Sequence, residues 1–143
     1  MQGKYNLFFD SSVLISALNS PYGGAGIVLS ACRAGEFSLY VSDQVLEEVE
    51  RNIQEKFPLI QKRFINFILS RPTVVSGTSL LEIRHAHALI KTNDAPILAA
   101  AIKVKPDFLI TWDIKHFLKA SVVDAVSFTI CTPQDFIRMY WKR

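Results

Sequence analysis

Short apolar runs alternate along this chain with longer segments in which apolar residues recur every three or four positions. The runs predict buried strands, and the recurrent segments predict amphipathic helices. Strands are expected at residues 5–9, 37–41, 73–75, 108–111 and 127–131. Helices are expected at 11–18, 25–34, 43–57, 59–69, 79–90, 95–104, 114–119 and 134–140. This alternation indicates an α/β protein in which helices cover both faces of one parallel sheet.

Turn and capping residues mark several of these boundaries. Gly35 follows the second helix in the position that favours a left-handed cap, and Ser42 precedes the third helix as its N-cap. Phe57 is expected on the core-facing stripe at the end of that helix. Residues 132–135 read as a capping box with proline at the first helical position.

Length and composition fit a single globular domain. The chain has 143 residues, half of them hydrophobic, with no repeat or linker, so one domain spanning 1–143 is expected. The net charge of +3 suits an anionic partner but is far from a polybasic arm. Cys32 and Cys131 are too few for a disulfide framework and indicate buried thiols in a reducing compartment. No signal-like or membrane-length apolar run is present, so a cytoplasmic protein without a membrane partner is expected.

Three aspartates stand where a strand ends or a helix begins. Asp10 and Asp113 follow the first and fourth expected strands, and Asp94 opens the helix before the fourth strand. Each alone is most simply a helix cap, which stabilises a helix by roughly 1 kcal/mol. In a parallel sheet, however, strand carboxyl ends and helix N-termini share one edge, so all three are expected together. Unmatched carboxylates repel one another, and oxygen ligands of this kind favour Mg²⁺ or Mn²⁺.

Glu48 is the candidate for a fourth carboxylate. Its helix starts at the same sheet edge, and helical periodicity places it beside the core stripe, next to Val45. Glu47 points further towards solvent. Periodicity alone favours an ordinary solvated glutamate at position 48, and the adjacent Glu47 leaves the identity of the second acid open.

Four segments, in this order, resemble a PIN domain from its first strand to its last helix: FFDSSVLISAL, LYVSDQVLEEVERNI, DAPILAAAIKVKPDFLITWD and ICTPQDFI. The resemblance implies a three-layer α/β/α fold with a five-stranded parallel sheet in the order 3-2-1-4-5. In PIN domains an acidic quartet binds divalent metal and cleaves RNA. The matching positions here are Asp10, Glu48, Asp94 and Asp113.

The resemblance extends to the residues around that quartet. Ser12 matches a small polar residue that supports the first aspartate, and Thr111 matches a hydroxyl two residues before the last one. Relatives often carry a further acid just before the third aspartate, where residues 91–93 here are Lys-Thr-Asn. This difference predicts a less acidic site with weaker metal affinity.

The resulting expectation is a Mg²⁺- or Mn²⁺-dependent endoribonuclease that hydrolyses single-stranded or structured RNA, as the toxin of a toxin–antitoxin pair. Its expected partners are RNA, an antitoxin protein and a second copy of the chain. The alternative is a PIN-fold module that holds RNA or protein without cutting, against which the four mutually repelling acids argue. A phospho-acceptor receiver domain is disfavoured, because serines follow Asp10 and Cys131 ends the last strand.

Basic residues next to Asp113 are the candidates for phosphate contacts. Lys115, His116 and Lys119 follow it directly, although a solvated helix face is an equally good interpretation of them. Trp112 either stacks on a base or packs at a strand end, and packing is the commoner role. His85 and His87 are two residues apart, so they face different ways on a helix and do not predict a metal pair.

Overall fold

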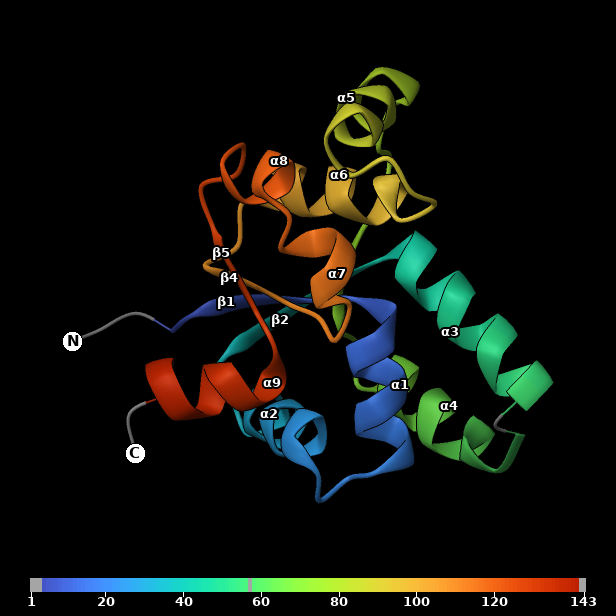
Figure 1. The fold of residues 1–143 in the computed structure, drawn as a ribbon. Helices are drawn as coiled ribbons and strands as arrows, with labels where there is room; N and C mark the ends of the chain where they lie inside the picture. Colours follow the sequence, from blue (N-terminus) through green and yellow to red (C-terminus); the bar gives the residue numbers. More distant parts are fainter. Residues whose placement is uncertain (1–3, 57, 142–143) are drawn as a thin grey trace.

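The computed structural model describes residues 4–56 and 58–141, which form a parallel sheet surrounded by helices (Figure 1). The first half contains β1 (Asn6–Phe9), α1 (Ser11–Asn19), α2 (Gly24–Arg33), β2 (Ser38–Ser42), α3 (Asp43–Lys56), the 3₁₀ turn η1 (Pro58–Ile60) and α4 (Gln61–Leu69). The second half contains β3 (Thr73–Val75), α5 (Leu80–Ile90), α6 (Ala95–Val104), β4 (Phe108–Ile110), α7 (Ile114–Phe117), α8 (Ala120–Val123), β5 (Thr129–Cys131), α9 (Pro133–Asp135) and the π turn η2 (Phe136–Tyr140).

The sheet has the order β3-β2-β1-β4-β5, and all its neighbouring strands are parallel. This order confirms the expected α/β fold. The central strand β1 pairs on one side with β2, Leu7 opposite Leu39, and on the other with β4, Phe8 opposite Leu109. The backbone of β1 bonds to both neighbours, and the residues of β4 lie about a hundred positions after those of β1 in the chain.

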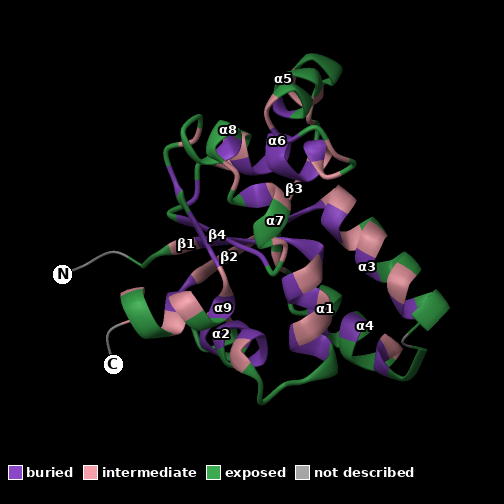
Figure 2. Ribbon diagram, in the orientation of Figure 1, coloured by how far each residue is buried: buried purple, intermediate pink, exposed green. Residues whose placement is uncertain are grey.

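Helices lie on both sides of the sheet, which makes the fold three-layered (Figure 1). α5, α6 and α8 lie on one side, whereas α1, α2 and α9 lie on the other. The strands at the centre are buried from both sides (Figure 2). Leu7, Phe8 and Phe9 expose no surface, so successive side chains of β1 pack against helices on opposite faces.

Several predicted boundaries need correction. The helix expected at 114–119 ends at Phe117, and a separate short helix, α8, follows it. The Thr132 side chain accepts a hydrogen bond from the Asp135 backbone N–H, but the Asp135 carboxylate pairs with Arg138, so the expected capping box is only half formed. The core position expected for Phe57 lies outside the described residues.

Both ends of α5 are fixed by side chains. At its start, Ser79 and Glu82 form a capping box that sequence reading missed. At its end, Lys119 Nζ donates to the carbonyl of Ile90, and Ser121 Oγ donates to the carbonyl of Leu89. These bonds satisfy carbonyls that the last helical turn leaves unpaired, so α8 and the residue before it hold α5 in place.

The turn between α1 and α2 brings two backbone segments very close. A Cβ added at Gly26 would lie 2.2 Å from the carbonyl oxygen of Pro21, whereas one added at Gly24 would find ordinary contacts beginning at 3.7 Å. Only glycine therefore fits at position 26 without a backbone shift. Within the described residues no single helix has the length and apolarity to span a bilayer, and only α1 and α2 together, bent by 92°, meet that test.

Candidate metal centre

Asp10 ends the central strand and is the N-cap of α1, yet its side chain makes no capping hydrogen bond. Only 3% of the residue is exposed. Its Oδ2 atom accepts hydrogen bonds from Thr111 Oγ1 at 2.8 Å and from Ser12 Oγ at 3.0 Å. The carboxylate is therefore held by two neutral hydroxyls rather than by a cation.

The same two hydroxyls connect Asp10 to the turn after β4. Ser12 Oγ accepts from the backbone N–H of Trp112, and Thr111 Oγ1 accepts from the backbone N–H of Asp113. Each hydroxyl donates on one side and accepts on the other. The ends of β1 and β4 are thus joined through side chains as well as through the strand ladder.

The other oxygen of Asp10 has no such partner. Oδ1 is buried and accepts no hydrogen bond from any described residue. Burial raises the pKa of Asp10, the Thr111 and Ser12 hydroxyls lower it, the negative charge of Glu48 raises it, and the backbone N–H of Ser11, as the smallest of these effects, lowers it. A buried, unsatisfied carboxylate oxygen destabilises the fold unless something electropositive reaches it.

Asp94 is the N-cap of α6 and likewise makes no side-chain capping bond. Its backbone N–H donates to Thr92 Oγ1, which fixes the turn in front of the helix. Its pKa is raised to about 7, first because the carboxyl is partly buried. The negative charges of Asp10, Glu48 and Asp113 raise the pKa further, so the four carboxyl groups lie within electrostatic reach of one another.

The structure places the two neighbouring glutamates of α3 differently. Glu48 is half-buried beside Val45 and Val49, and its charge acts on both Asp10 and Asp94. Glu47 is exposed and lines a hollow between α3 and α4, with Leu46 and Phe64. Of these two glutamates, Glu48 is the one on the side of the aspartates.

Asp113 is the N-cap of α7, and here the carboxylate does cap: Oδ1 accepts from the backbone N–H of His116. His116 Nδ1 also lies 3.0 Å from each Asp113 oxygen. His116, which its position just after Asp113 suggested for phosphate contact, is thus engaged with a predicted metal ligand.

Capping explains only one of the three aspartates, since Asp10 and Asp94 make no capping bond. Together with Glu48 they form a set of oxygen donors that has no Lys or Arg partner within 4 Å among the described residues. Oxygen ligands and the unpartnered Asp10 Oδ1 fit a hard divalent cation such as Mg²⁺ or Mn²⁺.

As the side chains stand, no three His, Cys, Asp or Glu side chains of the described chain surround a common point. Both oxygens of Asp113 instead lie 3.0 Å from His116 Nδ1.

The remaining candidates for RNA contact differ in their exposure and in their existing hydrogen bonds. Lys115 is exposed on α7, whereas Lys119 lies beyond this helix with its ammonium group on the Ile90 carbonyl. The expectation that both lysines lie on the helix after Asp113 is therefore wrong for Lys119, since α7 ends at Phe117. Trp112 is 38% exposed, which leaves part of its ring accessible beside the site.

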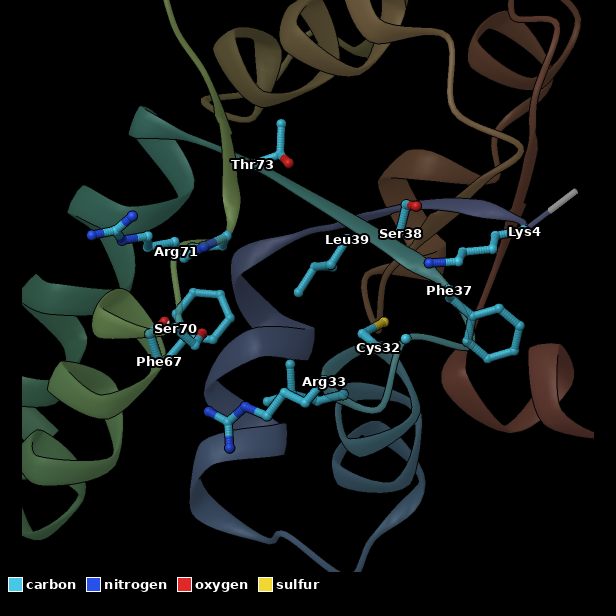
Figure 3. Close-up of a pocket in the computed structure, with 13 residues that line it drawn as sticks. Lys4, Cys32, Arg33, Phe37, Ser38, Leu39, Phe67, Ser70, Arg71 and Thr73 are labelled. Atoms are coloured by element: carbon cyan, nitrogen blue, oxygen red, sulfur yellow. Dashed lines mark hydrogen bonds between the residues drawn. The ribbon is translucent and has the colours of Figure 1, made fainter.

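The carboxylates lie apart from the hollow in Figure 3, which has a volume of about 420 Å³. That hollow is formed where β2 and β3 begin and where α2 and α4 end, at the opposite edge of the sheet. Figure 3 shows Lys4, Arg33 and Arg71 among its lining residues. Because basic side chains favour helix C-termini, Arg33 and Arg71 have an ordinary structural explanation.

Comparison with known proteins agrees with this architecture. A profile of the PIN domain matches residues 6–115, a span that contains all four carboxylates. No curated protein matches the chain. Among solved structures it is similar to VapBC2 from Rickettsia felis bound to a DNA fragment from their promoter, with a TM-score of 0.63 and 18% identity over 88% of this chain and 96% of that one. The structural similarity concerns the fold, and the profile match identifies the family: this chain belongs to the PIN domain family.

Proposed function

We propose that this protein is a metal-dependent endoribonuclease whose catalytic and metal-binding residues are Asp10, Glu48, Asp94 and Asp113. The observation that carries the proposal is the buried, unpartnered Oδ1 of Asp10, which lies within electrostatic reach of Glu48 and Asp94. These groups destabilise each other without a cation, whereas a bound divalent ion would make the arrangement favourable.

The residues of the chain have distinct parts in the proposed reaction. Thr111 and Ser12 hold one oxygen of Asp10 and leave the other free for a metal ion. Glu48 and Asp94 supply further oxygens from α3 and from the start of α6. Asp113 would complete the set once His116 turns from it, and the freed imidazole could then meet a phosphate. A bound Mg²⁺ or Mn²⁺ would lower the pKa of a water and stabilise charge on the phosphate.

The biological role that we propose is that of the toxin of a toxin–antitoxin pair in the cytoplasm. It is supported by PIN family membership and by structural similarity to a component of VapBC2, which is bound to a DNA fragment from their promoter. RNA is the proposed substrate, an antitoxin protein the proposed partner, and a second copy of the chain a further one. Co-expression with the product of a neighbouring small reading frame, followed by co-purification and growth rescue, tests this role.

The activity is tested with purified protein and labelled single-stranded RNA. Cleavage should require Mg²⁺ or Mn²⁺, stop with chelator, and be lost in Asp10→Asn and Asp94→Asn. Glu48→Gln should also abolish RNA cleavage. Glu47→Gln changes an exposed residue one position away, and this variant should cleave RNA like the parent protein. Cleavage that survives chelation and both aspartate substitutions contradicts the metal mechanism. RNA that is bound but not cut in the presence of metal supports the binding module instead.

A further inference from the structure

A further hollow, with mainly apolar walls, lies between α5 and α6, immediately beside Asp94. It has a volume of about 380 Å³ and is lined by Ile83, Arg84, His87, Thr92, Asn93, Ala95 and Pro96. Asn93 and Ala95 are the chain neighbours of Asp94, and Thr92 accepts a hydrogen bond from its backbone N–H. The hollow therefore begins one residue away from the candidate metal centre.

The charge of this hollow is positive and unmatched. Arg84 and His87 are exposed and lie three residues apart, so they share one face of α5. No Asp or Glu lines the hollow, and Arg84 forms no ion pair within the described part of the chain. Two acids adjoin the lining residues in sequence: Glu82 is bound to the backbone N–H of Ser79 at the start of α5, and Asp94 belongs to the carboxylate set described above. These features favour an anionic occupant over an internal salt bridge.

The other walls of the hollow suit the remainder of a nucleotide. Ile83, Ala95 and Pro96 give an apolar surface, and the His87 imidazole gives a flat ring on which a base can stack. Thr92 and Asn93 offer hydrogen-bonding groups that can meet the edge of a base. A volume near 380 Å³ lies at the small end of ligand sites and has room for one nucleotide, not for a folded RNA element.

Both helical walls of the hollow are anchored by contacts with the rest of the fold. Its α5 wall is capped at the start by Ser79 and Glu82 and tied at the end by Lys119 and Ser121. Its α6 wall is buried in the core through Ile97, Leu98 and Ala101. Lys119 and His116, engaged with Ile90 and Asp113, are not free for RNA as they stand, so the basic groups of α5 are the better-placed ones.

We infer that the α5–α6 hollow binds one nucleotide of the RNA strand next to the cleaved linkage, with Arg84 on its phosphate and His87 on its base. This inference rests on the proposed function, because it places the nucleotide relative to the scissile phosphate. It goes further in assigning a position of strand recognition to residues 83–96, outside the four carboxylates.

The test is binding of a fluorescein-labelled single-stranded RNA of ten nucleotides to cleavage-inactive Asp10→Asn protein over a range of salt concentrations. Arg84→Ala/His87→Ala in that background is compared with Arg33→Ala/His85→Ala. The control removes the same side chains from the opposite sheet edge and from a position of α5 that does not line the hollow. The first pair should weaken binding by about 5- to 150-fold, the range for losing one stacked base, and lower the salt slope by about 0.7 for one phosphate. The control pair should do neither.

An abasic nucleotide placed at each position in turn locates the contact. At one position the abasic substitution should weaken RNA binding to the Asp10→Asn protein. At that same position it should have no further effect on binding to the protein that also carries Arg84→Ala/His87→Ala. Equal affinities and salt slopes for the two double variants overturn the inference, and so does an abasic effect that persists without Arg84 and His87. The change in Tm on adding Mn²⁺, measured on the protein with Asp10 restored, separates the metal-site hypothesis from the nucleotide-site hypothesis. If Mn²⁺ raises Tm but Arg84→Ala/His87→Ala leaves the RNA affinity unchanged, only the nucleotide site is rejected. A protein that neither binds RNA nor responds to Mn²⁺ rejects both. The single variant Arg84→Gln, also at an exposed position, repeats the comparison if the double variant unfolds.

Discussion

Removing the charge of Asp94 should stabilise the metal-free protein, although it disrupts the proposed site. The pKa of this carboxyl rises from an ordinary 3.8 to about 7 in the fold, because of burial and then of the charges of Asp10, Glu48 and Asp113. An acid with a raised pKa destabilises the fold once the unfolded chain has lost its proton. The penalty begins near pH 4, grows as pH rises to about 7, and is constant above that.

The size of the effect follows from that shift. A rise of about three pH units corresponds to about 4 kcal/mol, and solvent screening of a partly exposed carboxyl reduces this to about 1–2 kcal/mol. For a chain of 143 residues this is an increase in Tm of about 3–7 °C for Asp94→Asn at pH 8. Asn keeps the shape of the side chain, so packing around Ala95 should not change.

The assay is thermal or urea unfolding in chelator at pH 5 and pH 8. The control is Asp124→Asn, the same exchange at an exposed aspartate, which should change stability by no more than about 0.5 kcal/mol. Adding Mg²⁺ at ten times its Kd should stabilise the parent by about 1.4 kcal/mol and the Asp94→Asn variant much less. The reasoning is refuted if Asp94→Asn is no more stable than the parent at pH 8, or if its advantage is the same at both pH values.

Four further outcomes can be measured on the same preparation. In chelator, Glu48→Gln should raise Tm and abolish Mn²⁺-induced stabilisation, while Glu47→Gln should leave both unchanged; equal behaviour of the two would reject the assignment of Glu48. Thr111→Val should lower stability by about 1–3 kcal/mol, since it removes a hydroxyl that donates to Asp10 and accepts from the Asp113 N–H; a neutral result in urea unfolding would contradict this role. Lys119→Met should destabilise the fold by about 1 kcal/mol without changing the salt slope of RNA binding, because its ammonium group is bound to Ile90. Gly26→Ala should destabilise by about 1–3 kcal/mol because its Cβ would meet the Pro21 carbonyl, whereas Gly24→Ala should be neutral or slightly stabilising.

Much of the architecture was accessible from periodicity alone. β3 and α6 were predicted at their observed bounds, because Thr73–Val75 is isolated by turn residues and Ala95–Val104 is a long apolar segment between clear stops. α8 was missed because four residues are too few to show a helical period. The early end of α7 was missed for a different reason. Lys119 is bound to the last turn of α5, and no local sequence pattern predicts such a tertiary contact.

The site was accessible from the sequence only in outline. The predicted parallel topology put the three aspartates at one edge of the sheet. It could not show that Asp113 makes a capping hydrogen bond whereas Asp10 and Asp94 do not. One oxygen of Asp10 accepts hydrogen bonds and the other does not, and this difference depends on Thr111, about a hundred residues away in the chain. The hollow beside Asp94 is formed between two helices, and the sequence analysis did not single out Arg84, which stands three residues before His87 on α5.

The position of β1 at the centre of the sheet has a consequence for synthesis of the chain. The hydroxyl of Thr111, which bonds to Asp10, and the second neighbour of β1 are synthesised about a hundred residues after Asp10. Domains form during translation from the N-terminus onwards, so an emerging chain has β1 and β2 long before β4 is available. The four carboxylates can meet only after β4 and the turn that carries Asp113 have left the ribosome. A ribosome-bound fragment that stops before Asp113 therefore lacks the proposed site, and under the proposed function it cannot cut the messenger from which it is being translated.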